Sequence, residues 1–145
     1  MDNLSPAIRW IKKIFCKPLD FSSNSKKILI VDDDQGLLKV IRAGLMQKGY
    51  QIYAAATGEK GLRLAKQIKP DLIILDVILP GIKGREVCAL LKEDGETRDI
   101  PVIFMTAKDS PDDVKAELEV GAVSHLTKPI NVQQLFVEIK KILGT

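Results

Sequence analysis

Aspartates, a threonine and a lysine stand where four apolar runs of this chain end. Asp32 and Asp33 follow the first of these runs, Asp76 follows the second, and Thr106 and Lys128 follow the last two. Carboxylate oxygens without cysteine or histidine among them favour Mg²⁺ over zinc. A threonine hydroxyl can donate to a phosphoryl oxygen, and a lysine supplies a point charge for the same group. The set therefore predicts phosphoryl chemistry, which asks mainly for positioning and charge neutralisation.

Asp76 is the predicted reacting group. It ends the run Leu72–Leu75, whose branched apolar residues do not alternate with polar ones. Such a run is typical of a strand buried on both faces of a parallel sheet. A charged residue after it lies at the carboxyl edge, where open α/β sheets bind ligands. A carboxylate can attack phosphorus and form an acyl phosphate, and clustered acids repel one another unless a cation neutralises them.

Five strand-helix units are expected to position these groups. From Lys26 onward, short apolar runs alternate with segments of helical spacing, and Asp34 is interpreted as a cap of the first helix. Alternation of this kind predicts an α/β fold, a doubly wound parallel sheet of five strands with helices on both faces. One sheet edge would then gather the candidate groups. The strands are expected at residues 28–31, 52–55, 72–75, 102–105 and 123–126.

The composition is that of an ordinary globular domain. Hydrophobic residues make up 46% and charged residues 28% of the 145 positions. The net charge of +3 is too small to indicate direct nucleic-acid binding, and no apolar run approaches the ~20 residues of a transmembrane helix. The two cysteines fit neither a disulfide framework nor a metal motif. A cytoplasmic location is therefore expected.

The first 25 residues are read as an extension, and residues 26–145 as the main domain. Residues 5–17 have the spacing of a short amphipathic helix with a basic face, and a linker rich in serine follows it. A helix this short needs a surface on which to bury its apolar side. Three interpretations stay open: it packs on its own domain, a second copy or another partner; it lies on a membrane surface; or it is a remnant of a longer architecture or a flexible tail.

Five short stretches carry a more specific pattern. They are ILIVDDD at 28–34, LDVILPG at 75–81, PVIFMTA at 101–107, GA at 121–122 and LTKP at 126–129. In this combination they resemble the response-regulator receiver domain of two-component signalling, a single-domain fold like that of chemotaxis regulators. The resemblance runs from Lys26 to Leu143. It implies a flavodoxin-like sheet with strand order 2-1-3-4-5.

The resemblance also implies roles for individual residues. A sensor histidine kinase or a phosphotransfer protein would donate a phosphoryl group to Asp76, and the Lys128–Pro129 bond would be cis. The Mg²⁺ ligands would be Asp32, Asp33, Asp76 and the backbone carbonyl of Ile78. The phosphoryl oxygens would be held by Thr106, the amide of Ala107 and Lys128.

His125 departs from the family pattern, which usually has an aromatic residue there. In the family this ring turns inward as the residue matching Thr106 moves toward the phosphoryl group, and we expect His125 to take this switch role. The surface formed by the fourth helix, the fifth strand and the last helix would then change for a downstream target protein. No DNA-binding or enzymatic domain is recognised in the sequence, so the output is expected through a partner protein, self-association or a domain lost by truncation.

Two rival functions are weighed against this switch. The first is a Mg²⁺-dependent phosphohydrolase with Asp76 as nucleophile, which would need a second acid and usually a cap over its substrate. No insertion large enough for a cap interrupts the domain. The second is a docking module that is never phosphorylated, against which the intact acids, Thr106 and Lys128 argue. Beyond phosphorylation from a donor and autodephosphorylation, no conventional enzyme activity is expected.

Overall fold

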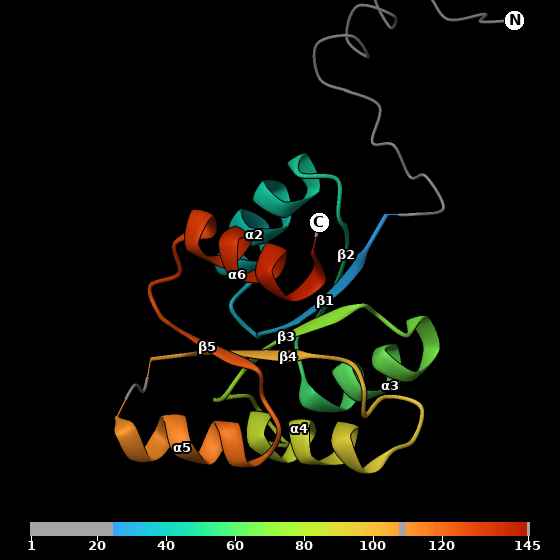
Figure 1. Cartoon of the computed structure of the whole chain (residues 1–145), viewed down its shortest axis with the longest axis vertical. Coiled ribbons are helices and arrows are strands. Elements are labelled where there is room, and N and C mark those ends of the chain that lie inside the picture. The colour runs from blue at the N-terminus through green and yellow to red at the C-terminus, as the bar shows by residue number, and fades with distance from the viewer. Residues whose placement is uncertain (1–24, 108–109, 145) are drawn as a thin grey trace, which may run out of the picture.

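The computed structural model describes residues 25–107 and 110–144. Five strands form one sheet in the order β2-β1-β3-β4-β5, and every neighbouring pair is parallel (Figure 1). The fold and strand order expected from the sequence are confirmed. The helix expected at residues 5–17 lies outside the described residues. The strands are β1 (Lys27–Val31), β2 (Gln51–Ala55), β3 (Leu72–Asp76), β4 (Val102–Thr106) and β5 (Ser124–Thr127).

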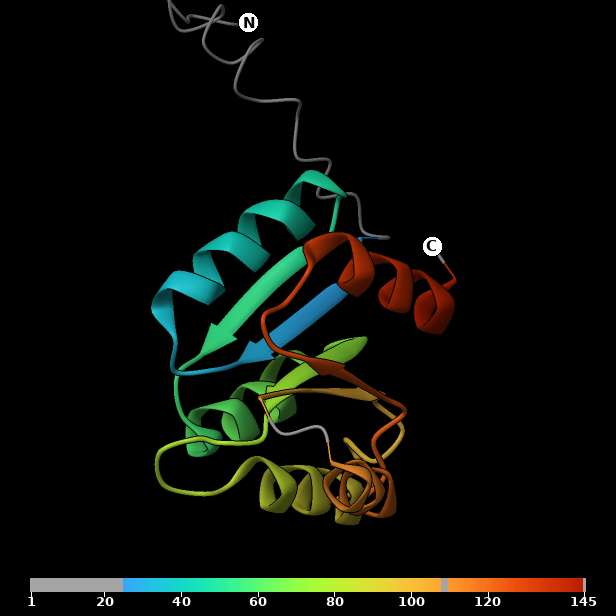
Figure 2. The ribbon, with the colours of Figure 1, turned by 90° about the vertical axis from the view of Figure 1, so that its left-hand side faces the viewer.

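Helices cover both faces of the sheet, as Figures 1 and 2 show. Two of them, α2 and α6, lie on one face, and the other three lie on the opposite face. Within the described residues, no helix is long and apolar enough to cross a membrane. The helices are α2 (Gln35–Gln47), α3 (Gly58–Ile68), α4 (Gly84–Glu93), α5 (Pro111–Glu119) and α6 (Val132–Leu143).

The apolar core forms two layers, one on each side of the sheet. Alternate residues of a strand point to opposite faces, so Ile28 packs with α2 and α6 while Leu29 packs toward α3 and α4. Every residue of β3 and β4 is buried, which explains their unbroken apolar runs. Each fully buried aliphatic side chain contributes roughly 1.5–3 kcal/mol. The sheet is therefore a stable scaffold for the polar residues at the carboxyl ends of its strands.

Side-chain caps fix where most helices begin. Asp34, Thr57, Ser110 and Asn131 each accept a hydrogen bond from a backbone amide in the first turn of the helix that follows. The helix α4 is the exception, because Lys83 at its N-cap makes no side-chain bond. The start of α4 must therefore be fixed by packing, and that packing involves the candidate site.

Candidate functional site

Four polar residues meet at the carboxyl edge of the sheet. Asp32 follows β1, Asp76 ends β3, Thr106 ends β4 and Lys128 follows β5. Three of them are deeply buried: Asp32 and Thr106 are 0% exposed and Asp76 is 5% exposed. The backbone amide of Lys128 donates to the carbonyl of Thr106 at 2.8 Å, which joins the ends of β4 and β5. The structure thus brings together residues that lie up to 96 positions apart.

Lys128 bridges the two buried aspartates. Its Nζ lies 2.9 Å from Oδ2 of Asp32 and 3.2 Å from Oδ2 of Asp76. The peptide bond from Lys128 to Pro129 is cis, as the resemblance implied. The remaining oxygens have backbone donors: Oδ1 of Asp32 accepts from the amide of Asp34 at 2.9 Å. Oδ1 of Asp76 accepts from the amide of Ile78 at 3.2 Å.

Negative charge exceeds positive charge at this edge. Burial and, next, the Asp32 carboxylate raise the pKa of Asp76, and the Ile78 amide and Lys128 offset only part of this effect. Burial alone would lower the pKa of Lys128, but its hydrogen bonds and charge interactions with Asp32 and Asp76 outweigh burial and raise that pKa. Lys128 therefore stays charged, while ionisation of Asp76 is less favourable than that of an exposed carboxyl group.

The acids at the edge fit a small divalent cation. One carboxylate oxygen from each of Asp32, Asp33 and Asp76 lies within 4.8 Å of the others. Asp33 is exposed, so the cluster opens to solvent on that side. An all-oxygen set with excess negative charge suits Mg²⁺, which keeps several of its waters and takes few protein ligands. Ile78 is two residues beyond Asp76, and its side chain reaches solvent, since the residue is 50% exposed.

Asp34 takes no part in this cluster and serves as a helix cap. Its Oδ1 accepts from the amide of Leu37 at 3.1 Å, at the start of α2. Its backbone amide nevertheless orients Asp32, as described above. The interpretation of Asp34 as a cap is therefore confirmed. Of the three consecutive aspartates, Asp32 and Asp33 belong to the acidic cluster and Asp34 caps α2.

Gly84 fixes α4 against the backbone of Asp76, a contact that the sequence did not reveal. A Cβ atom at Gly84 would collide with the carbonyl oxygen of Asp76 and with Val77. The amide of Gly84 donates to the carbonyl of Val77 at 3.0 Å. The first turn of α4 thus packs directly on the segment that carries the candidate nucleophile. A glycine at a presumed helix start is a weak signal, because it also occurs there without any close approach.

Thr106 and Ala107, to which the resemblance assigns the phosphoryl contacts, lie at the end of β4 and directly after it. Thr106 is buried at the end of β4, and Ala107, the next residue, is exposed. The register aligns Thr106 with Thr127 of β5, one residue before Lys128. Since Asp76 is aligned with Met105, the ends of β3, β4 and β5 reach the same edge.

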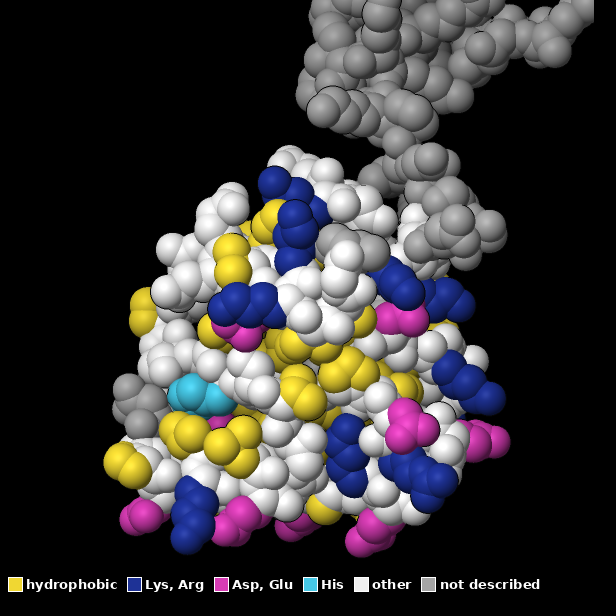
Figure 3. Space-filling view, in the orientation of Figure 1, with side chains coloured by type: hydrophobic (Ala, Val, Ile, Leu, Met, Phe, Trp, Pro, Cys, Tyr) yellow, Lys and Arg dark blue, Asp and Glu magenta, His cyan; other side chains and the backbone are white. Residues whose placement is uncertain are grey.

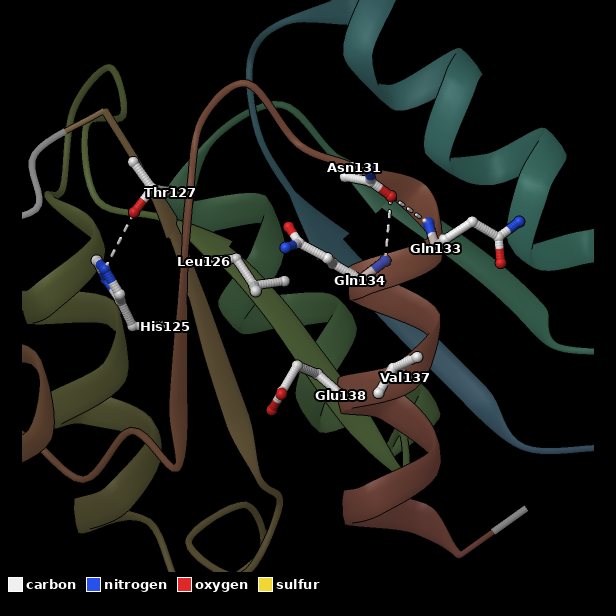
Figure 4. A pocket seen from close by; sticks show the side chains of 8 residues that line it. All are labelled: His125, Leu126, Thr127, Asn131, Gln133, Gln134, Val137 and Glu138. Carbon is white, nitrogen blue, oxygen red and sulfur yellow. Dashed lines mark hydrogen bonds between the residues drawn. The ribbon is translucent and has the colours of Figure 1, made fainter.

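His125 lies on β5 and bonds to an acid of α5. Its Nδ1 is 2.8 Å from Oε2 of Glu117. On the other side of the ring, Nε2 is 3.4 Å from Oγ1 of Thr127, as Figure 4 shows. The His125 side chain is 17% exposed, while that of Glu117 is 0% exposed. The burial of Glu117 was not predicted from the sequence, because an acid between Ala116 and Leu118 on a short helix is normally solvent-exposed.

A groove runs between β5 and α6, away from the acids at the sheet edge. It measures about 580 Å³ and is lined on the strand side by His125, Leu126 and Thr127. Figure 4 shows these side chains on one wall and those of α6 on the other. Figure 3 shows basic and acidic side chains interspersed over this view of the molecule, around a central group of hydrophobic ones.

Curated proteins similar to this chain include two bacterial regulators. The alkaline phosphatase synthesis transcriptional regulatory protein PhoP of Bacillus subtilis is 39% identical over 119 residues, which are 82% of this chain and 49% of that protein. The response regulator PleD of Caulobacter vibrioides is 40% identical over 118 residues, or 81% of this chain and 26% of that protein. The chain thus spans about half, or less, of these relatives.

Solved structures agree over nearly the whole described domain. A putative response regulator from Chloroflexus aurantiacus superposes with a TM-score of 0.79 at 34% identity, covering 84% of this chain and 100% of that one. The receiver domain of a sensor histidine kinase from Pseudomonas aeruginosa has a TM-score of 0.77 at 27% identity, covering 83% and 99%. That structure holds a magnesium ion in its active-site cleft.

The family match covers most of the chain and contains every residue of the acidic edge. Residues 28–140 match the family described as the response regulator receiver domain. The fold, the strand order and the relatives agree with this match. This chain therefore belongs to the response regulator receiver domain family.

Proposed function

We propose that this chain is a phosphorylation-dependent signalling switch that accepts a phosphoryl group on Asp76. The observation that carries the proposal is the lysine bridge: Lys128 contacts both Asp32 and Asp76 at an edge that still has excess negative charge. Such an edge is arranged to take a cation and a phosphoryl group together. Receiver domains bind Mg²⁺ at an acidic pocket of this kind, and a relative holds magnesium there.

The donor would be the phosphohistidine of a sensor histidine kinase or of a phosphotransfer protein. An oxygen of the Asp76 carboxylate forms a bond to phosphorus while the phosphorus–nitrogen bond of the donor breaks. The imidazole nitrogen keeps the electron pair and can then take a proton. The product is an acyl phosphate on Asp76 and a free histidine on the donor.

The residues around Asp76 would orient and neutralise the incoming group. Asp32, Asp33, Asp76 and the carbonyl of Ile78 would hold Mg²⁺, which would offset the negative charge of the phosphoryl oxygens. Lys128 would turn from Oδ2 of Asp76 toward a phosphoryl oxygen, keeping its contact with Asp32. The Thr106 hydroxyl and the Ala107 amide would donate to the other oxygens.

His125 would link the phosphoryl group to the surface that partners read. In this proposal the ring moves inward as Thr106 shifts, and the surface of α5, β5 and α6 changes for a downstream target protein. A few kcal/mol of differential stabilisation is enough to bias two such states. The described domain would act in the cytoplasm and need no direct contact with nucleic acid. In this proposal, residues 1–25 are an extension that attaches the domain to a membrane surface, a partner or a second copy.

Acetyl phosphate with Mg²⁺, followed by intact mass measurement, tests this function against its rivals. A switch gains one phosphoryl group, and the Asp76→Asn variant does not gain it. Asp71→Asn is a matched control, because Asp71 lies before β3, at the opposite end of that strand, where its Oδ2 accepts from the Lys27 amide at 2.8 Å. Catalytic turnover of small phosphate esters would favour the hydrolase. Absence of any adduct on the wild-type chain would favour the docking module and overturn the proposal.

A further inference from the structure

The helix α5 turns an acid, rather than an apolar residue, toward the sheet. Glu117 is 0% exposed and is the buried residue of α5, whereas the adjacent Leu118 is 52% exposed. A helix normally buries its apolar stripe and exposes its charges. A buried carboxylate is costly unless a partner compensates it. The position of α5 therefore depends on what Glu117 contacts.

Glu117 depends on one side chain, that of His125. A carboxylate can only accept, so the 2.8 Å contact to its Oε2 requires a proton on Nδ1 of His125. The other oxygen, Oε1, is buried and has no hydrogen-bond partner among the described residues. Both ring nitrogens of His125 are engaged, since Nε2 lies 3.4 Å from the Thr127 hydroxyl. The pair therefore fixes the ring and anchors α5 to β5.

Neighbouring charges in the described residues are committed elsewhere. One turn before Glu117, Asp113 of α5 pairs with Arg85 of α4 at 2.9 Å. On α6, Glu138 lines the same groove as His125, but it accepts from Ser124 at 3.1 Å and pairs with Lys141 at 3.3 Å. Glu117 is thus the acid in direct contact with the ring.

We propose that Glu117 is a positioning residue of the switch that restrains His125 in the unphosphorylated protein. Moving the ring toward Thr106 would break the Nδ1–Oε2 bond and leave a buried carboxylate without its partner. The pair therefore opposes switching and sets how much stabilisation the phosphoryl group must supply. This inference rests on the proposed function, because it concerns the residue that would transmit phosphorylation.

The contact restrains the ring through a hydrogen bond to a charged acceptor, and such bonds are shorter and stronger than those between neutral groups. His125 is the chain's single histidine, so its ring signals in NMR spectra can be assigned without ambiguity.

Affinity for beryllofluoride, an unreactive phosphoryl analogue, measures the restraint in the presence of Mg²⁺. The chains compared are the full wild type, Glu117→Gln, and the matched control Glu119→Gln on the exposed side of the same helix. We expect Glu117→Gln to bind roughly tenfold more tightly than the wild type, because it lacks one charge-assisted bond. Glu119→Gln should bind beryllofluoride with the affinity of the wild type.

A second variant and a double-mutant cycle test whether a change in beryllofluoride affinity comes from misfolding of Glu117→Gln. Glu117→Leu removes the acid but keeps an inward-facing side chain, and it should also tighten beryllofluoride binding. Urea unfolding of Glu117→Gln, His125→Gln and the double variant should be clearly non-additive if the pair carries free energy. Additive effects would overturn the pair as a restraint.

The outcomes separate this inference from the function on which it rests. If the wild type binds beryllofluoride and Glu117→Gln binds no more tightly than Glu119→Gln, the inference is wrong and the switch stands. If the wild type fails to bind beryllofluoride with Mg²⁺ present, the proposed function falls, and the restraint on it falls as well.

Discussion

The domain has two sites with buried carboxylates, one at the acidic sheet edge around Asp76 and one beneath α5 at Glu117. They differ in how many positive or donor groups each carboxylate has. At the sheet edge, Asp32 and Asp76 share the single ammonium of Lys128. Beneath α5, Glu117 has His125 to itself. The edge is short of positive charge, and it opens to solvent at Asp33. The second site has one donor for one acid, and that acid is fully buried.

This difference in charge balance indicates different roles for the two sites. Excess negative charge among fixed strand ends favours binding of a cation or of a group that arrives with one. A buried acid that has its own hydrogen-bond donor on another element needs no ligand, and the bond instead holds the two elements together. Since breaking a buried pair leaves one charge uncompensated, such a pair resists motion. The sheet edge is therefore suited to binding a cation, and the Glu117–His125 contact is suited to holding α5 on β5.

The largest effect on stability is expected from Lys128→Met. This change removes the ammonium that both Asp32 and Asp76 contact, while the Lys128 side chain is only 23% exposed. Without Mg²⁺ the free energy of unfolding should fall by about 2–4 kcal/mol. Added Mg²⁺ should restore much of the loss, because it binds the folded state. Urea unfolding with chelator and with Mg²⁺ measures both numbers.

The exposed Lys115 provides the control for this change. Its side chain is 76% exposed, and its contact with Glu119 measures 4.0 Å. Lys115→Met should change the free energy of unfolding by less than about 0.5 kcal/mol and respond to Mg²⁺ like the wild type. A Lys128→Met chain that is as stable as this control without Mg²⁺ would contradict the charge argument.

A smaller loss, and one that Mg²⁺ does not repair, is expected from His125→Ala. The substitution leaves Glu117 buried without its donor, at a cost of about 1–3 kcal/mol. Thr127→Val is the control, since it removes only the 3.4 Å contact at the other ring nitrogen. Urea unfolding with and without Mg²⁺ distinguishes the two sites: if Mg²⁺ rescues His125→Ala as it rescues Lys128→Met, the sites are not separate.

Asp76→Asn should raise stability in the absence of Mg²⁺. The pKa of Asp76 lies above its ordinary 3.8 in the folded protein, chiefly through burial and then through Asp32. The folded state therefore holds this proton more tightly than the unfolded chain, and stability falls as pH rises between the two pKa values. The gain from Asn should therefore grow as pH rises above about 3.8, up to the folded pKa of Asp76.

The pH dependence of unfolding tests the sign of that argument. The difference between Asp76→Asn and the wild type should shrink toward zero as pH approaches the ordinary value of about 3.8. Saturating Mg²⁺ should reverse the order at pH 7, because the ion stabilises the wild type through the Asp76 carboxylate. If the difference in unfolding free energy between the two proteins is constant across this pH range, the charge of Asp76 is not its cause.

The smallest effect is expected from Arg85→Met, which separates the influence of burial from that of pairing. Arg85 and Asp113 lie 2.9 Å apart, and their side chains are 33% and 27% exposed. Partly exposed pairs contribute about 0–1 kcal/mol. The loss in urea unfolding should therefore be below that of His125→Ala. A larger loss would mean that α5 is held mainly through α4 rather than through Glu117.

The sequence by itself determined the sheet and the edge that carries the acids. Apolar runs such as Leu72–Leu75 predict buried parallel strands, and the expected strand positions agree with the structure to within one residue at each end. Parallel strands place their carboxyl ends at one edge whatever the loops between them do. The sequence alone therefore predicts that four residues lie close together, because each stands at the end of a strand: Asp32, Asp76, Thr106 and Lys128.

Only the tertiary structure decided how charges pair across elements. Whether Lys128 bridges two acids depends on the approach of β5 to β3 through β4, and the close packing of Gly84 on Asp76 depends on the path of the loop before α4. Glu117 shows the limit most clearly, because local pattern predicts an exposed acid and the structure buries it. Its burial is tolerable only beside the imidazole of His125, on another element, and a one-dimensional pattern does not encode that contact.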